Sequence, residues 1–161
     1  MGEVTVRWAV AGDAAVLLEI EQTSWDGTTG FPSMVERMGD NFFAKSGPEV
    51  HLVAEIDGAV VGYLRLESKY PFPEGAGVLA VNGLAVAPAA RGQGAASALL
   101  TAATDEARRR EARKLSLHVF GSNATARRLY ERHGYVVEAT HPAEFVVEGR
   151  PTDDVVLAKV L

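Results

Sequence analysis

The sequence predicts an α/β (α+β) fold, a mixed and largely antiparallel central sheet of about seven strands with about four helices on its faces. Three observations lead to this prediction. Short β-rich runs recur along the chain, the dipeptide Asp57-Gly58 joins two of them, and two helical patterns each follow a strand in the second half. Asp-Gly between β-rich runs is typical of a hairpin with a type I′ turn. No linker divides the 161 residues, so residues 1–161 are expected to form a single domain.

In the first half of the chain, capping residues indicate where helices begin. Asp13 suits the N-cap of a first helix, and Ser33 suits that of a second, with Glu36 placed to complete a capping box. The expected elements are strands over residues 4–10, 50–56 and 59–66 and helices over residues 13–25 and 33–44.

In the second half, glycines indicate local irregularities. Asn82-Gly83 lies inside a strand pattern, which suggests a β-bulge or the close approach of another backbone. Gly134 follows a short helical pattern and suits its C′ position. The expected elements are strands over residues 78–86, 115–119, 135–139 and 154–161 and helices over residues 94–113 and 123–133.

Composition excludes several classes of protein. The chain has no cysteine, which rules out disulfides, thiolate zinc sites and a cysteine nucleophile. The net charge of −5, from 16 basic and 21 acidic residues, argues against nucleic acid as a partner. No apolar run reaches the roughly 18 residues of a membrane span. We therefore expect a cytoplasmic protein that does not bind membranes.

The turn Arg91-Gly92-Gln93-Gly94-Ala95-Ala96 is the first candidate site. It follows a strand and opens an Ala/Leu-rich helix, whose first amides are unpaired and lie at the positive end of the helix dipole. Such a turn suits an anion, but it also describes an ordinary helix start. A nucleotide-binding P-loop would need Gly-Lys-Ser/Thr here, and a Rossmann fold would place the loop in an N-terminal βαβ unit.

Two motifs together resemble the GNAT family of N-acetyltransferases. The first is Leu84-Ala-Val-x-Pro followed by Arg91-x-x-Gly-x-Ala. The second, about 30 residues later, is a strand, Asn123, a helix with Ala126-x-x-x-Tyr130, and then Gly134-Tyr135. Because Val10-Ala-Gly-Asp13 and the Asp57-Gly58 hairpin also match, the resemblance covers nearly the whole chain.

The resemblance implies an enzyme that moves the acetyl group of acetyl-CoA to a primary amine of a small molecule or peptide. Strands ending near Val86 and Val119 would splay apart around the pantetheine arm. Tyr130 would donate a proton to the departing thiolate, as a phenol can. The residues expected to bind acetyl-CoA are Leu84, Ala85 and Val86 through their backbone, Arg91 through its charge, Gly92, Gln93, Gly94, Ala95, Ala96 and Ser97 through their amides, and Asn123 through its side chain.

The base that removes a proton from the amine is less clear from the sequence. Many GNAT proteins place a glutamate where this chain has Asn82, and an amide cannot take a proton. Glu67 and His118 are two alternatives, although structural roles also suit them. The other histidines form no ligand-like group, so no metal site is expected.

The acceptor pocket is expected from three segments, residues 25–43, 70–73 and 145–151. Peptide N-termini, polyamines, amino acids and aminoglycosides all remain open as acceptors. Side chains that could line the pocket are Trp25, Phe31, Phe42, Phe43, Tyr70 and Phe72, and acidic Asp26, Glu36 and Asp40 could meet an ammonium group.

Two further points follow from the resemblance. Homodimers are frequent in the family, so a homodimer is compatible with it. The missing carboxylate at Asn82 also leaves an alternative function open, a CoA-binding sensor that regulates a partner without catalysis.

Overall fold

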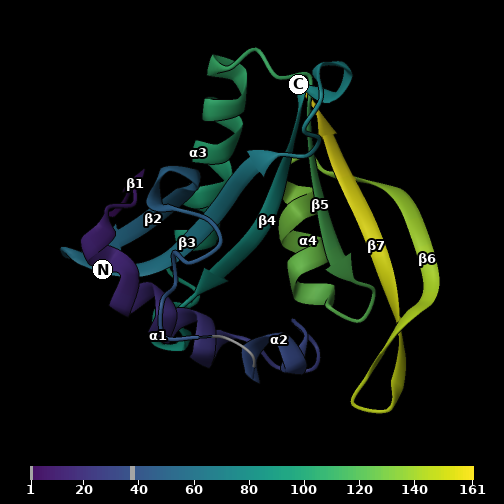
Figure 1. The fold of residues 1–161 in the computed structure, drawn as a ribbon, viewed down its shortest axis with the longest axis horizontal. Helices are drawn as coiled ribbons and strands as arrows, with labels where there is room; N and C mark the ends of the chain where they lie inside the picture. Colours follow the sequence, from purple (N-terminus) through teal and green to yellow (C-terminus); the bar gives the residue numbers. More distant parts are fainter. Residues whose placement is uncertain (1, 37–38) are drawn as a thin grey trace.

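The computed structural model describes residues 2–36 and 39–161 and confirms the predicted order of strands and helices (Figure 1). The seven-stranded sheet has the order β1-β2-β3-β4-β5-β7-β6, and only β4 and β5 pair in parallel. The strands are β1 Val4–Trp8, β2 His51–Ile56, β3 Ala59–Ser68, β4 Val78–Val86, β5 Lys114–Phe120, β6 Val136–Val147 and β7 Arg150–Val160. The α-helices are α1 Ala14–Ser24, α2 Pro32–Glu36, α3 Ala95–Arg109 and α4 Ala124–Arg132.

The predicted hairpin is β2–β3. Both turn residues have positive φ, 52° at Asp57 and 79° at Gly58, as a type I′ turn requires. The prediction is therefore confirmed down to the turn type.

Helices cover the two faces of the sheet. Apolar residues of α3 and α4, among them Leu99, Leu100 and Tyr130, form the main core with one face. On the other face, Leu17 and Ile20 of α1 pack in a second cluster that includes Tyr63 of β3. Side chains of β3, β4 and β5 therefore alternate between an α3/α4 face and an α1 face.

The second helix is shorter than predicted. It spans Pro32–Glu36, so Ser33 lies inside it and is not its N-cap, and residues 39–46 form turns and bends. Residues 37 and 38 of the predicted helix lie outside the described residues. The rings of Phe42 and Phe43, which were predicted to be part of this helix, instead pack against the buried ring of His51.

The C-terminal hairpin is longer than predicted. Strands expected over residues 135–139 and 154–161 extend to 136–147 and 150–160, and β7 lies between β5 and β6. The hairpin reaches beyond the end of β5 toward α2 (Figure 1). Segment 145–151, expected to contribute to the acceptor pocket, is the end of this hairpin with its turn.

Smaller corrections concern the ends of other elements. The first strand ends at Trp8, and α3 ends at Arg109, followed by a turn. Asp13 precedes α1 but makes no capping hydrogen bond to it. Its carboxylate instead accepts hydrogen bonds from Arg7 and from the amide of Val10, because the chain folds back there onto β1.

Candidate active site

The sheet opens between β4 and β5. Their parallel pairing runs from Val78 and Lys114 to Val81 and Leu117 and ends there. Beyond this point the two strands diverge, and α4 is visible between them (Figure 1). The splayed pair expected from the resemblance is therefore present.

Asn82 lies at the start of this opening. β3 pairs Arg65 with Gly83 and Leu66 with Val81, so Asn82 is the extra residue of a β-bulge. The bulge predicted from Asn82-Gly83 is confirmed. It bends β4 where its pairing with β5 ends.

Three predicted residues follow the bulge on β4. Leu84, Ala85 and Val86 pair with β3 along one edge, while the edge toward β5 lies beyond the last parallel pair. An extended group placed in the opening could therefore hydrogen-bond to this backbone edge like another strand.

The glycine-rich turn lies at the end of the same opening. Gly92 and Gly94 have φ of 79° and 89°, and α3 begins at Ala95. Among the described residues, no backbone carbonyl accepts a hydrogen bond from the amides of Gly92 to Ser97. A Cβ added at either glycine would meet no atom within 4 Å. A row of free amides beside open space fits a pyrophosphate.

Arg91 and Ser97 make side-chain contacts on either side of this turn. Arg91 Nη2 donates to the carbonyl of Ser24 over 3.2 Å, which ties the turn to the end of α1. Ser97 Oγ lies 3.0 Å from Nε2 of His133, which ties α3 to the end of α4. Both contacts hold the turn between two helices, and Gln93 and Ala96 remain partly exposed beside it.

The end of β5 leads into α4 through Asn123. Asn123 Oδ1 accepts a hydrogen bond from the Ala126 amide over 3.2 Å, so it caps α4 as its sequence position suggested. Within residues 2–36 and 39–161, the side-chain nitrogen of Asn123 makes no hydrogen bond.

Tyr130 projects from α4 into the main core beneath the opening. The residue is 9% exposed, and its ring lies 5.9 Å from that of Tyr135 in a T-shaped contact. Burial raises the pKa of Tyr130 to about 12. The phenol therefore keeps its proton over the ordinary working range of pH.

Glu67, on β3, is a titratable group on the α1 face beside Asn82. Asn82 Nδ2 donates to Glu67 Oε2 over 2.7 Å, and Ser46 Oγ donates to Glu67 Oε1 over 3.0 Å. Burial by itself would raise the pKa of Glu67, but these two hydrogen bonds and the nearby charges of Arg65 and His51 lower it overall. The hydrogen bonds from Asn82 and Ser46 therefore favour the ionised form of Glu67.

His118 is the second titratable group at the opening. Its Nδ1 lies 2.9 Å from Oδ2 and 3.1 Å from Oδ1 of Asp154 on β7. The His118 side chain is 57% exposed and the Asp154 side chain 11% exposed. The sequence pointed to His118 but not to Asp154, because no local signal connects residues on two separate strands.

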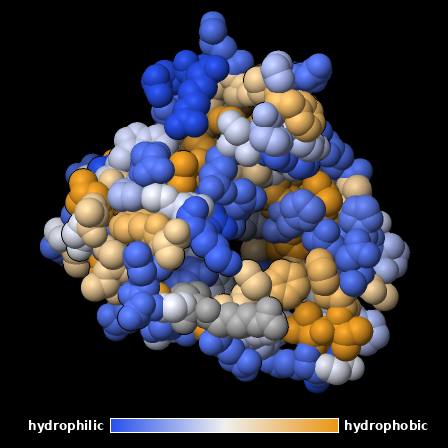
Figure 2. All heavy atoms as spheres, in the orientation of Figure 1, coloured by the Kyte–Doolittle hydropathy of each residue, from blue (hydrophilic) through white to orange (hydrophobic). Residues whose placement is uncertain are grey.

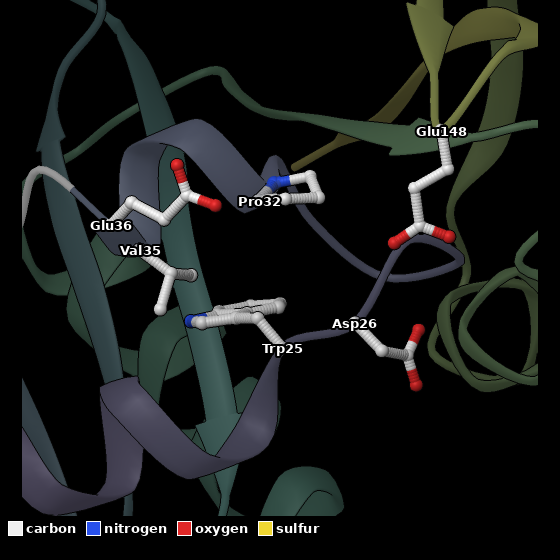
Figure 3. Close-up of a pocket in the computed structure, with 6 residues that line it drawn as sticks. All are labelled: Trp25, Asp26, Pro32, Val35, Glu36 and Glu148. Carbon is white, nitrogen blue, oxygen red and sulfur yellow. The ribbon is translucent and has the colours of Figure 1, made fainter.

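A pocket of about 250 Å³ lies on the same side of the molecule. It is placed near the opening, because Ser24 Oγ, next to Trp25, lies 3.4 Å from the carbonyl of Val86. Figure 3 shows Asp26 and Glu148 on one side of the pocket and Val35 and Glu36 on the other. The space-filling view is hollowed near the middle of this face (Figure 2). The lining residues are Trp25, Asp26, Pro32, Val35, Glu36 and Glu148.

The pocket corrects part of the predicted lining. Trp25, Asp26 and Glu36 line it, whereas Asp40 does not. Phe31 packs beside it, with its ring 5.0 Å from Phe120 and 4.9 Å from Phe145.

The other aromatic candidates lie elsewhere. Phe42 and Phe43 pack in the α1-face core, and their rings contact each other 5.2 Å apart. Tyr70 and Phe72 stack on each other and are 40% and 50% exposed. None of these four rings lines the pocket.

The comparisons with known proteins agree with this geometry. Residues 15–135 match the model of the acetyltransferase (GNAT) family. The chain belongs to the GNAT family. It is an N-acetyltransferase, and acetyl-CoA is its acetyl donor.

Individual relatives show how far the GNAT similarity extends. The uncharacterized N-acetyltransferase YhfO of Bacillus subtilis is 36% identical over 101 residues, 60% of this chain and 68% of YhfO. The crystal structure of a GCN5-related N-acetyltransferase from Kribbella flavida has a TM-score of 0.83 at 28% identity and covers 98% of both chains. The structure of yncA from Salmonella typhimurium, solved with its cofactor acetyl-CoA, has a TM-score of 0.78 at 25% identity over 99% and 95% of the two chains.

In residues 2–36 and 39–161, no helix is long and apolar enough to cross a membrane. The same residues contain no group of three or more His, Cys, Asp or Glu side chains that could hold a metal ion.

Proposed function

We propose that this N-acetyltransferase acetylates a primary amine that bears additional positive charge. The observation behind the proposal is the Trp25 pocket, where the carboxylates of Asp26, Glu36 and Glu148 lie around an aromatic ring next to the opening of the sheet. Carboxylates attract an ammonium group, and the face of an indole ring does so as well. Polyamines, aminoglycosides and basic peptides have this chemistry.

We assign the donor end of the site to the residues predicted from the sequence. The edge of β4 at Leu84 to Val86 would pair with the pantetheine arm, and the amides of Gly92 to Ser97 would hold the pyrophosphate. The free amides and the open space beside Gly94 support this assignment. Asn123 would bind near the pantetheine, and Arg91 would add positive charge beside the turn.

Tyr130 is the proposed general acid. The bound thioester supplies an activated acetyl group. Tyr130 gives a proton to the sulfur as the bond between sulfur and the acetyl carbon breaks, and the amine nitrogen loses a proton as its bond to that carbon forms. The buried phenol, protonated up to a pKa of about 12, supports this role.

The acceptor would approach from the opposite side of the sheet. Tyr130 belongs to the α3/α4 core, whereas Trp25 follows α1 on the other face. Asp26 is held ionised, because hydrogen bonds from Thr28 lower its pKa. A cationic amine would therefore reach the opening along a surface of negative charge.

A CoA-binding sensor without catalysis is the second candidate, favoured by the amide of Asn82 at the position of the usual glutamate. Two further proposals accompany either function, namely one domain over residues 1–161 and a cytoplasmic location, and both functions are compatible with a homodimer.

The test is a thiol-release assay with acetyl-CoA and a panel of amines of matched size. Spermidine, an aminoglycoside and a Lys-rich peptide should be acetylated faster than amines with neutral or acidic tails. Isothermal titration should show acetyl-CoA binding below millimolar concentration. Binding without release for any amine would favour the sensor, and equal rates for charged and neutral amines would remove the charge preference.

A further inference from the structure

We propose that His118 is the general base that takes the proton from the amine, and that Asp154 is the residue that positions it. The inference rests on the proposed function, because it names the residue that completes the same reaction. It also explains how the chain can work with Asn82 in place of a glutamate.

The first step is the position of His118. Val81 and Leu117 are the last parallel pair, so Asn82 and His118 are the first residues of β4 and β5 beyond it. Leu117 and Val119 are buried in the α3/α4 core, so the side chain of His118 between them projects from the α1 face. His118 therefore lies on the side from which the acceptor would come, at the start of the opening.

The second step is the contact with Asp154. Asp154 is 8% exposed, and its described side-chain hydrogen bonds are those to His118. A carboxylate only accepts hydrogen bonds, so Nδ1 of the ring carries a hydrogen, and in the neutral ring the lone pair is then on Nε2. An almost buried carboxylate thus fixes the tautomer in which the exposed nitrogen is a base.

Other charged or titratable side chains lie on the strands and segments beside His118 and Asp154. On β6, the strand register places His141 opposite Asp154, and His141 Nδ1 lies 4.0 Å from Glu144. Lys69, directly after the end of β3, donates from Nζ to Ser116 Oγ, two residues before His118 on β5.

Glu67 is the rival base on the far side of Asn82. Both of its carboxylate oxygens accept hydrogen bonds, from Asn82 and from Ser46, and these lower its pKa. A carboxylate stabilised in this way is a weaker proton acceptor than a neutral imidazole. The lone pair of His118 Nε2 has no such donor among the described residues, and His118 is therefore the better base.

In the proposed reaction, one side chain takes up a proton and another gives one up, on opposite faces of the sheet. His118 Nε2 takes the proton that leaves the amine nitrogen as the new C–N bond forms. Tyr130, on the opposite face, gives a proton to sulfur as the C–S bond breaks. The two side chains return to their starting states by exchanging these protons with water.

The test uses His118→Asn, whose amide can still donate to Asp154 but cannot act as a base. At pH 7 we expect kcat to fall about 100-fold or more, as for the loss of a general base. The deficit should shrink at pH 10, where an ordinary amine is itself about half neutral. Acetyl-CoA affinity by isothermal titration should stay within about twofold of the wild type, since the donor site is intact.

A second readout does not depend on activity. Nitrogen-15 NMR of the free protein should show the Nδ1–H tautomer of His118, and Asp154→Asn should shift the population toward the other tautomer. Glu74→Gln, at an exposed position outside the site, is the control and should leave kcat and the His118 spectrum unchanged. If His118→Asn has a much lower melting temperature than the wild type, His118→Gln provides a second variant.

The outcomes separate the two levels of the proposal. A wild-type chain that acetylates amines while His118→Asn and His118→Gln retain full kcat would overturn the base alone. So would a loss in Glu67→Gln with none in the His118 variants, or a deficit that is the same at every pH. A wild type with no turnover on any amine would overturn the proposed function and the base together.

Discussion

The side-chain amide of Asn82 donates a hydrogen bond to Oε2 of Glu67 over 2.7 Å, which fastens the bulge of β4 to the carboxylate of β3. Asn82, which stands where many GNAT proteins have a glutamate, is thus hydrogen-bonded to a glutamate of the neighbouring strand. Glu67 in turn accepts from Ser46, so it also fastens the segment before β2.

Replacing Asn82 with alanine should raise the pKa of Glu67 toward its ordinary value of 4.5, because one of two donors is lost. Since the folded-state pKa is lowered, ionised Glu67 stabilises the fold above pH 4.5, and this stabilisation disappears as pH falls through the folded-state value. We expect Asn82→Ala to cost about 1 kcal/mol at pH 7 and less at pH 3. Carbon-13 NMR of the glutamate carboxyl groups would measure the pKa of Glu67, and urea unfolding at both pH values would measure the free energy of unfolding. A Glu67 titration identical to the wild type would contradict the role of Asn82.

Tyr130→Phe should lower kcat about 100-fold while acetyl-CoA affinity changes little, because only the acidic proton is removed from a buried ring. With a pKa of about 12, the wild-type phenol should cause no fall in kcat between pH 8 and about pH 10. Stopped-time thiol release across that range would measure both effects. Tyr70→Phe, at an exposed ring outside the site, is the control. Full turnover in Tyr130→Phe would remove Tyr130 from the mechanism.

Gly94→Ala should weaken acetyl-CoA binding about tenfold, because a Cβ would enter the space beside the free amides and φ of 89° is unfavourable for alanine. Gly58→Ala is a matched control with φ of 79° in the β2–β3 turn. Each variant should lose about 1–2 kcal/mol of stability, but only Gly94→Ala should bind the donor more weakly. Equal affinities in the two variants, measured by isothermal titration, would argue against the turn as the pyrophosphate site.

Asp13→Asn should destabilise the fold at pH 7 by about 1–3 kcal/mol, because the carboxylate accepts from Arg7 and from the Val10 amide. Hydrogen bonding to Arg7 lowers the pKa of Asp13, so its stabilisation is present above the ordinary value of 3.8 and is lost as pH falls through the folded-state value. Thermal unfolding of wild type and variant should therefore converge toward pH 2. Asp40→Asn, at an exposed aspartate, should change neither curve. A constant difference from pH 7 to pH 2 would refute the ionic origin.

Glu148→Gln should raise KM for a polycationic acceptor about threefold at low salt and leave kcat nearly unchanged, because it removes one exposed charge from the pocket. The effect should fade at about 0.5 M salt as screening increases. Glu74→Gln, at an exposed position away from the pocket, is the control. An equal rise in KM for a neutral-tailed amine would show that charge is not the cause.

Much of the local structure around the proposed donor site could be predicted because its signals are local. Gly92 and Gly94 indicate a turn with positive φ, Asn123 indicates a cap, and Asn82-Gly83 indicates a bulge, each through conformational preferences of one or two residues. The acceptor side could not be predicted in this way. Trp25 and Glu148 meet in one pocket only because the C-terminal hairpin returns to α2, and local preference carries no information about that meeting.

The sequence by itself determined the order of the elements, the β2–β3 turn, the bulge at Asn82 and the turn that opens α3. These features depend on backbone conformations that a few neighbouring residues favour on their own. Tertiary structure alone decided that the helix begun at Pro32 ends by Gly39, and that β7 enters the sheet between β5 and β6. It thereby placed Asp154 beside His118, a contact over 36 positions of sequence. Such contacts arise from burial and strand register over the whole sheet, which no local pattern encodes.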